Sequence, residues 1–313
     1  MAMCKYITVD GKPVPYAAAT VPVHSAAVKY GASVFEGLRA YWNAEQGELY
    51  VFRLREHMVR LVQSMKIMRF KTDISVDALC EQLLVHMRAN GHKADCHIRF
   101  NALVVGEGAM DTSAPIQFAC VSEERPAKAA ADKAISAQIS SWRRIDDTTM
   151  PPRVKSAANY NNGRFGTLQA RADGYGEPIF LTQQGKVAES GGSCLFMIRD
   201  GVPATPTVTG GILESVKRAS LIALFARKFG KAVQEREIDR TELYVADELF
   251  LCGSAYEITP IVDLDRLPIA DGKVGADTVA LWRAYDAVVR GRDNAFAEWR
   301  TPVHGGPGAC VSV

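Results

Sequence analysis

Polar side chains alternate with apolar ones along residues 95–105, Asp-Cys-His-Ile-Arg-Phe-Asn-Ala-Leu-Val-Val. A period of two is typical of a β-strand, in which successive side chains point to opposite faces. His97, Arg99 and Asn101 therefore share one face of this predicted strand. Such a face is either solvated or lines a pocket, and an arginine in a pocket can bind a carboxylate through two parallel hydrogen bonds.

Several common catalytic motifs do not occur in the sequence. It has no Gly-x-Gly-x-x-Gly, no phosphate loop ending in Gly-Lys-Ser or Gly-Lys-Thr, no His-Glu-x-x-His and no Gly-x-Ser-x-Gly. Dinucleotide, nucleotide, zinc-protease and serine-hydrolase sites would lack their working parts. The six histidines have no metal-ligand spacing and the seven cysteines form no Cys-x-x-Cys pair. We therefore expect neither a metal site nor a disulfide framework.

Six short segments, in this order and spacing, resemble the branched-chain aminotransferase family, which are class IV, pyridoxal-phosphate-dependent enzymes of fold type IV. They are residues 30–39 (Tyr-Gly-Ala-Ser-Val-Phe-Glu-Gly-Leu-Arg), 51–61, 98–99, 152–160 (Pro-Arg-Val-Lys-Ser-Ala-Ala-Asn-Tyr), Glu189 with Leu195-Phe196, and 253–260 (Gly-Ser-Ala-Tyr-Glu-Ile-Thr-Pro). The resemblance covers roughly residues 5–290. It implies an α+β fold of two domains, a small N-terminal α/β domain and a larger C-terminal pseudo-barrel domain.

The resemblance also implies a site for pyridoxal 5′-phosphate. Lys155 matches the lysine that forms a Schiff base with the cofactor, a role that needs an amine whose pKa is lowered by desolvation. Glu189 matches the carboxylate that keeps the pyridine nitrogen protonated, so that the ring can accept electrons. Tyr160 matches the hydrogen-bond partner of the ring's phenolic oxygen. The expected phosphate ligands are Arg60, the backbone amides of Ile212 and Leu213 at a helix start after two glycines, and Ser254.

The substrate side of the site follows from the same resemblance. Arg99 is expected to bind the side-chain carboxylate of glutamate or 2-oxoglutarate, while an apolar wall that includes Phe35 accepts a hydrophobic side chain. The full predicted set is Tyr30, Phe35, Gly37, His97, Arg99, Ser254 and Ala255, with the last two amides holding the α-carboxylate. The implied reaction is a ping-pong transamination between an L-amino acid, branched-chain or otherwise hydrophobic, and a 2-oxo acid.

Several positions depart from the family pattern. His97 stands where a tyrosine is usual, Cys194 replaces an asparagine, and Leu213-Glu214 replace Thr-Arg, which brings a carboxylate near the expected phosphate. Two alternatives stay open. One is an enzyme of the same fold that acts on D-amino acids or amines, or that is a lyase of the aminodeoxychorismate type. The other is a non-catalytic, ligand-binding homologue.

The elements that must position these residues can be read from periodicity. Apolar residues at steps of three and four from Met58 to Met68 predict an amphipathic helix, and a second helix begins at an N-cap, Ser75, and ends at Gly91. Further helices are expected over 161–172 and before Gly230, and a hairpin turn at Asp10-Gly11. We expect a small domain over 1–123, a linker over 124–133, a larger cofactor-binding domain over 134–300 and a loose tail over 301–313.

Composition limits the kinds of partner. The chain has 313 residues, 48% of them hydrophobic, and 37 basic against 35 acidic residues leave a net charge of +2. A net charge this small gives no overall positive potential that would attract a polyanion. No apolar run approaches the roughly 20 residues needed to cross a bilayer. We therefore expect small-molecule partners, no nucleic acid and no membrane, and a cytoplasmic protein with reduced thiols. The resemblance implies a homodimer or a larger homo-oligomer.

Overall fold

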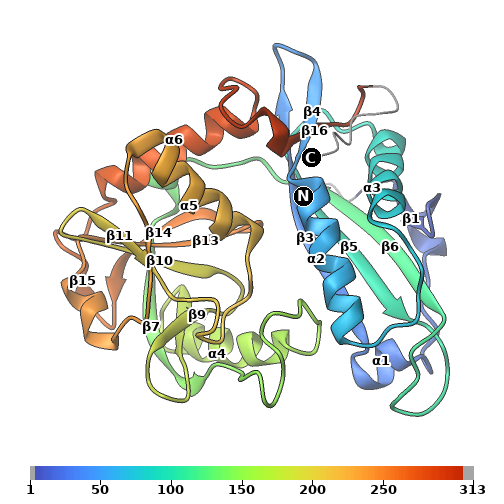
Figure 1. Ribbon diagram of the computed structural model, residues 1–313, viewed down its shortest axis with the longest axis horizontal. Coiled ribbons are helices and arrows are strands. Elements are labelled where there is room, and N and C mark those ends of the chain that lie inside the picture. The colour runs from blue at the N-terminus through green and yellow to red at the C-terminus, as the bar shows by residue number, and fades with distance from the viewer. Residues whose placement is uncertain (1–3, 306–313) are drawn as a thin grey trace. The chain divides into compact units, whose positions relative to one another are not determined.

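The computed structural model describes residues 4–305, which form two compact units (Figure 1). Within the described residues, unit 1 comprises 4–127, 154–158 and 287–305, and unit 2 comprises 128–153 and 159–286. The chain passes from one unit to the other between residues 127 and 128, inside the predicted linker. The predicted second domain needs correction, however, because residues 154–158 and 287–300 belong to unit 1, where both segments pair with its strands.

Unit 1 is built on an antiparallel sheet of seven strands in the order β16-β4-β3-β5-β6-β1-β2. The strands are β1 (Tyr6–Val9), β2 (Lys12–Pro15), β3 (Ser33–Asn43), β4 (Glu48–Phe52), β5 (Cys96–Val104), β6 (Ile116–Glu124) and β16 (Arg300–Pro302). Asp10 and Gly11 both have positive φ, at 48° and 78°, as the predicted two-residue hairpin turn requires. Alternate residues of β5 are buried, so the predicted strand and its polar face are confirmed.

Two helices, α2 (Leu54–Ile67) and α3 (Val76–Asn90), cover one face of this sheet (Figure 1). Both match predicted helices. The Ser75 hydroxyl accepts a hydrogen bond from the amide of Ala78, and Gly91 ends α3 with a φ of 60°. The apolar stripes of the two helices pack on the sheet to form the core of unit 1. The shorter elements are α1 (Ala26–Tyr30) and the 3₁₀ turns η1 (Tyr16–Ala18) and η4 (Ala297–Trp299).

The predicted loose tail, residues 301–313, includes residues that are paired or buried in the structure. Thr301 pairs with Val51 across the β16–β4 ladder, and the Val303 side chain is fully buried. The burial of Val303 and the backbone hydrogen bond from its amide to Leu49 fix this segment. Residues 306–313, also part of the predicted tail, lie outside the described residues.

Unit 2 contains a closed ring of strands, because β9 pairs with both β8 and β10. The ring runs β10-β13-β14-β7-β8-β9 and back to β10, with β11, β12 and β15 attached at its edges. This ring is the predicted pseudo-barrel. The strands are β7 (Ile135–Arg143), β8 (Glu177–Leu181), β9 (Val187–Ser190), β10 (Cys194–Arg199), β11 (Val202–Thr205), β12 (Gln234–Glu235), β13 (Glu248–Gly253), β14 (Glu257–Leu264) and β15 (Leu267–Pro268).

The helices of unit 2 follow the predicted positions in two cases. They are α4 (Tyr160–Ala172), α5 (Val216–Phe229) and α6 (Ala276–Val289), whose last three residues belong to unit 1, with 3₁₀ turns η2 (Ala130–Lys133) and η3 (Arg240–Val245). The first two match predicted helices, and Gly230 ends α5 with a φ of 63°. A close approach explains the glycine at 163, since a Cβ there would lie 2.2 Å from the carbonyl oxygen of Gly191. The helix α4 can therefore lie directly against the turn that follows β9.

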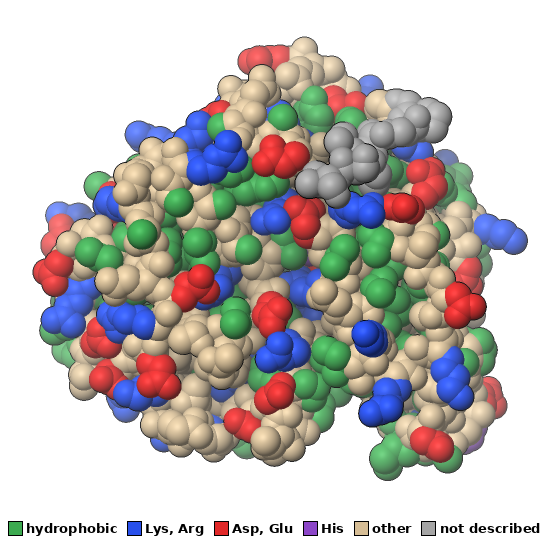
Figure 2. Space-filling model, in the orientation of Figure 1, with side chains coloured by type: hydrophobic (Ala, Val, Ile, Leu, Met, Phe, Trp, Pro, Cys, Tyr) green, Lys and Arg blue, Asp and Glu red, His purple; other side chains and the backbone are tan. Residues whose placement is uncertain are grey.

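The surface carries a mixture of charges. Acidic and basic side chains are interspersed over the face seen in Figure 2, in keeping with the net charge of +2. Among residues 4–305, no helix has the length and apolar character of a membrane span, and no cluster of three or more His, Cys, Asp or Glu side chains could hold a metal ion. The six cysteines in this range are buried free thiols.

Candidate active site

Arg60 lies on α2, where its guanidinium is almost completely buried against a carboxylate from β3. The Nε and Nη2 atoms donate to Glu36 at 2.7 and 2.6 Å, and Nδ1 of His57 lies 2.8 Å from the same carboxylate. Burial alone would raise the pKa of Glu36, but the charge of Arg60 and the hydrogen bonds from Arg60 and His57 lower it to about 2. Burial lowers the pKa of His57 despite Glu36, so this imidazole is neutral and donates through Nδ1.

The backbone of Lys155 is held against β3, in the segment that returns to unit 1. The amide of Phe35 donates to the carbonyl of Lys155 at 2.9 Å, and the amide of Ala157 donates to Ser33 at 3.1 Å. The Lys155 Nζ lies 4.8 Å from the centre of the Phe35 ring, and the Arg99 guanidinium lies 3.7 Å from it. Unit 1 therefore brings together three of the predicted site residues, two of them cationic, around one aromatic ring.

The other predicted substrate residues of unit 1 are Gly37 and His97, on the β3–β5 ladder, and Tyr30, at the end of α1. Register pairs Gly37 with Arg99 and Arg39 with His97 across β3 and β5. A Cβ at Gly37 would lie 3.6 Å from Nε2 of His97, so the two positions are neighbours. Burial, together with the charges of Arg39, Arg125, Lys155 and Arg99, lowers the pKa of His97 to about 4. The imidazole of His97, which stands where the family usually has a tyrosine, is therefore neutral at pH 7. Tyr30 ends α1 and is 43% exposed.

Glu189 lies in β9 of unit 2 and is only 4% exposed. Its Oε1 forms an ion pair with Nη2 of Arg144 at 2.5 Å and accepts a hydrogen bond from the amide of Leu213 at 3.2 Å. The thiol of Cys194 lies 3.6 Å from Oε2. A hydrogen bond with Cys252 and burial raise the pKa of Cys194 well above its usual value, so the thiol remains a weak donor. The carboxylate is therefore fixed in place by an arginine and a backbone amide of the same unit.

The expected phosphate amides are not at a helix start. The helix α5 begins at Val216, because the Ser215 hydroxyl caps it by accepting from the amide of Arg218. Ile212 and Leu213 precede this cap, and the Leu213 amide is directed to Glu189. Glu214 accepts a hydrogen bond from Nη1 of Arg153 at 2.8 Å. The two residues therefore lie beside the predicted cofactor carboxylate, but without the dipole that motivated their assignment.

Tyr160, Ser254 and Ala255 also belong to unit 2. Tyr160 begins α4, and a Cβ at Gly192 would lie 3.8 Å from its ring, so Tyr160 contacts the turn after β9. Ser254 and Ala255 are half-buried in the turn between β13 and β14. The predicted site residues thus form two sets. Unit 1 carries Tyr30, Phe35, Gly37, Arg60, His97, Arg99 and Lys155, and unit 2 carries Tyr160, Glu189, Ile212, Leu213, Ser254 and Ala255.

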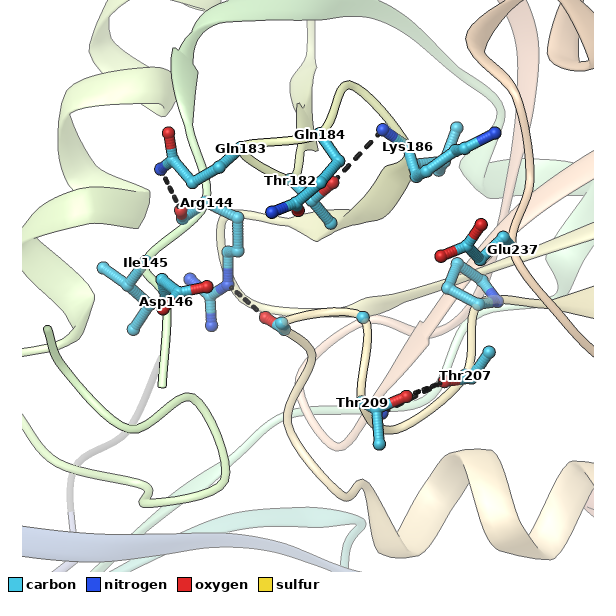
Figure 3. A pocket seen from close by; sticks show the side chains of 14 residues that line it. Arg144, Ile145, Asp146, Thr182, Gln183, Gln184, Lys186, Thr207, Thr209 and Glu237 are labelled. Atoms are coloured by element: carbon cyan, nitrogen blue, oxygen red, sulfur yellow. Dashed lines mark hydrogen bonds between the residues drawn. The ribbon is translucent and has the colours of Figure 1, made fainter. Parts of the chain in front are cut away.

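A small polar pocket of about 80 Å³ opens next to Arg144 (Figure 3). The Nε of Arg144 donates to the carbonyl of Gly211 at 3.1 Å, and the Gln183 amide donates to the carbonyl of Arg144 at 3.2 Å. The described residues that line this pocket include none of the predicted cofactor or substrate residues. Arg144 therefore extends from a solvated pocket to Glu189, and its guanidinium is fixed from both sides.

Comparison with known proteins identifies the family. Residues 33–264 match the family model described as "Amino-transferase class IV", which covers both units. The chain belongs to the class IV aminotransferases. It is 36% identical over 299 residues to a probable branched-chain-amino-acid aminotransferase of Aquifex aeolicus, with 94% of this chain and 96% of the relative covered.

Two solved structures of aminotransferases are similar over almost the whole chain. One is the branched-chain amino acid aminotransferase from Thermobaculum terrenum in its PLP form, with 39% identity, a TM-score of 0.89, and 97% and 99% of the two chains covered. The other is a branched-chain amino acid aminotransferase from T.th., complexed with N-(5′-phosphopyridoxyl)-L-glutamate, with 33% identity, a TM-score of 0.90, and 96% and 99% covered. This chain is thus an aminotransferase, and the predicted family and fold are confirmed.

Three buried groups around the predicted site residues were not anticipated from the sequence. Glu36 pairs with Arg60, His57 in turn donates to Glu36, and Arg144 pairs with Glu189. The signal for Glu36 was available, because a carboxylate at an inward-facing position of an apolar strand must find a cation. No comparable signal marks Arg144, which follows Arg143 at the end of β7 in a polar stretch.

Proposed function

We propose that this aminotransferase moves the amino group between an L-amino acid with a branched or other hydrophobic side chain and a 2-oxo acid such as 2-oxoglutarate. The observation that carries the proposal is the buried ion pair between Glu189 and Arg144, in a chain whose residues 33–264 match the class IV aminotransferases. Relatives named for branched-chain amino acids, and one solved with a phosphopyridoxyl-glutamate adduct, support the two substrate classes.

The donor set of the chain fits pyridoxal 5′-phosphate. This group needs an amine for its aldehyde, an anion for its ring nitrogen and a cation for its phosphate. Lys155 supplies a half-buried amine, Glu189 a buried anion and Arg60 a buried cation fixed by Glu36. When bound, the cofactor supplies an electron sink for the charge left on a substrate carbon after loss of its proton.

The roles of the chain's own groups follow from this fit. Lys155 would hold the cofactor's aldehyde through Nζ, and as a free amine it would carry the proton at the substrate carbon. Glu189 would pair with the protonated ring nitrogen, and Arg144 fixes the position of its carboxylate. Tyr160 donates to the ring oxygen, and Arg60, with the Ile212 and Leu213 segment and Ser254, binds the phosphate.

Substrate recognition is assigned to the remaining residues. The amides of Ser254 and Ala255 bind the α-carboxylate that every substrate carries. Arg99 binds the second carboxylate of glutamate or 2-oxoglutarate, and Phe35 provides apolar contact for a branched side chain. Tyr30, Gly37 and His97 complete the substrate side.

We also propose a cytoplasmic homodimer or larger homo-oligomer. The support for the oligomer is that three apolar side chains close together in the sequence of unit 1 are exposed: Val23 at 84%, Val28 at 54% and Tyr30 at 43%. Exposed apolar side chains that come together in a patch are typical of subunit interfaces. Light scattering on the purified protein tests the oligomer, and fractionation of cells tests the location.

The decisive experiment is a donor panel combined with a lysine variant. L- and D-forms of leucine, isoleucine, valine and glutamate, and a chiral primary amine, are each offered with 2-oxoglutarate or 4-methyl-2-oxopentanoate, and product chirality is measured. We expect the L-forms to react. Replacement Lys155→Ala should lower turnover by at least about a thousand-fold, whereas Lys231→Ala, which removes a partly exposed lysine paired with Asp277, should not. Unimpaired turnover by the Lys155 variant would refute the assignment.

A further inference from the structure

The turn that carries Ser254 and Ala255 is only three residues long. Gly253 pairs with Glu257 at the end of the β13–β14 ladder, which leaves Ser254, Ala255 and Tyr256 as the loop. Glu257, the first residue after the loop, has a φ of 57°, in the left-handed region. The direction of the Ser254 and Ala255 amides therefore depends on how the third loop residue is held.

Tyr256 is held by a buried carboxylate from another strand. Its hydroxyl donates to Oε1 of Glu177 in β8 at 2.7 Å, and the hydroxyl of Ser190 in β9 donates to Oε2 of the same carboxylate at 2.8 Å. Glu177 and Ser190 are 6% and 0% exposed. Burial and the charge of Glu177 raise the pKa of Tyr256, so the phenol stays protonated and donates.

The carboxylate connects two parts of the site that we assign to the aminotransferase. Ser190 directly follows Glu189, and Tyr256 directly follows Ala255. The same turn after β9 contains Gly192, at which a Cβ would lie 3.8 Å from both the Tyr160 and the Tyr256 rings. Glu177 thus joins the strand of the ring-nitrogen carboxylate to the turn with the expected α-carboxylate amides.

We propose that Glu177 and Tyr256 are positioning residues for substrate recognition: their hydrogen bond fixes the Ser254–Ala255 turn in the conformation that binds the α-carboxylate. This inference rests on the proposed function of that turn. Neither residue touches the reacting atoms. Hydrogen bonds to an ionised, buried acceptor are among the stronger ones in proteins, so the loss of this one should be visible in carboxylate binding.

The test uses the cofactor-loaded full chain with Tyr256→Phe, which keeps the ring against Gly192 and removes only the hydroxyl. We expect KM to rise about 10-fold, equivalent to about 1.4 kcal/mol, for both the amino acid and the 2-oxo acid, because both carry the α-carboxylate. The value of kcat and the dissociation constant of the cofactor should change by less than about two-fold. The Kd of 4-methylpentanoate, a carboxylate that cannot react, should rise with KM in calorimetric titration.

A matched control is available in the same unit. Tyr244 donates to Asp265 at 2.6 Å, a tyrosine–carboxylate bond that involves no predicted site residue, and Tyr244→Phe removes it. Both variants should lower the Tm, but only Tyr256→Phe should weaken carboxylate binding. Glu177→Gln should raise the same constants, and combining it with Tyr256→Phe should add little.

Two results would overturn the inference. One is a Kd for 4-methylpentanoate that stays within about two-fold of the wild-type value in Tyr256→Phe, and the other is an equal rise in Tyr244→Phe. Failure of the proposed function is seen separately, as a wild-type protein that binds the cofactor and transaminates no donor. In that case the Kd comparison still decides whether Tyr256 orders a carboxylate site.

Discussion

The buried Glu36–Arg60 ion pair makes a quantitative prediction for the variant Glu36→Gln. Glu36 is fully buried and accepts three hydrogen bonds, two from Arg60 and one from His57. A pKa that falls from 4.5 to about 2 favours the ionised carboxyl by about 3 kcal/mol, at about 1.4 kcal/mol per pKa unit. Removal of the charge also leaves the buried guanidinium without its counter-ion, for which losses of about 3–5 kcal/mol are usual.

We therefore expect Glu36→Gln to lower the free energy of unfolding by about 3 kcal/mol at pH 7. The sign of the pH dependence follows from the lowered pKa. The contribution of Glu36 is fully present above the unfolded-state pKa of 4.5 and is lost as the pH falls toward 2. The difference between wild type and variant should shrink over the same range.

The assay is urea unfolding followed by tryptophan fluorescence, at pH 7 and at several pH values down to 3. Because the chain has two units, the transition of unit 1 is the one to be compared. Glu56→Gln is the control: it breaks the Arg53–Glu56 pair, whose glutamate is 39% exposed, and should cost less than about 1 kcal/mol. A loss below about 1 kcal/mol for Glu36→Gln, or a loss that is independent of pH, would refute the reasoning.

Two further predictions concern stability. Burial and the nearby His92 lower the pKa of His86 to about 4, so this residue should contribute a loss of about 3 kcal/mol in the free energy of unfolding as the pH drops from 6.5 to 4. His86→Gln should reduce the pH dependence measured by urea unfolding, and an unchanged slope would contradict the assignment. Gly163→Ala would place a Cβ 2.2 Å from the Gly191 carbonyl oxygen, so the free energy of unfolding should fall by at least about 2 kcal/mol, measured by thermal or urea unfolding. The control is Arg164→Ala on the exposed side of α4, which should lower it by less than about 0.5 kcal/mol. Equal stability of these two variants would show that α4 can move away from the turn.

The local elements are the most predictable part of the fold. The helices α2 and α3 follow from apolar periodicity and from the cap residues Ser75 and Gly91, all of which act within a few residues. Strand partners are set by contacts between distant residues. The β16 segment, Arg300–Pro302, is too short for any periodic signal, so its pairing with β4 could not be predicted.

The predicted site shows the same division between local and distant information. Family resemblance indicates Arg60 and Glu189, but their partners Glu36 and Arg144 are chosen by the packing of other elements. The expectation that Ile212 and Leu213 stand at a helix start is wrong, because Gly210-Gly211 do not start a helix. Ser215, a residue type strongly preferred at the N-cap, begins it instead.

Unit 1 contains segments from both ends of the chain, so it cannot fold completely until the C-terminal segment has been synthesised. During synthesis the first 127 residues emerge long before Thr301, yet the outer ladder next to β4 is completed only when Thr301 pairs with Val51. Until then the nascent half presents an open β4 edge, ready to pair with the wrong strand. A truncated gene product that stops before residue 287 would keep that edge permanently, so we expect such fragments to aggregate and not to accumulate as an independent domain.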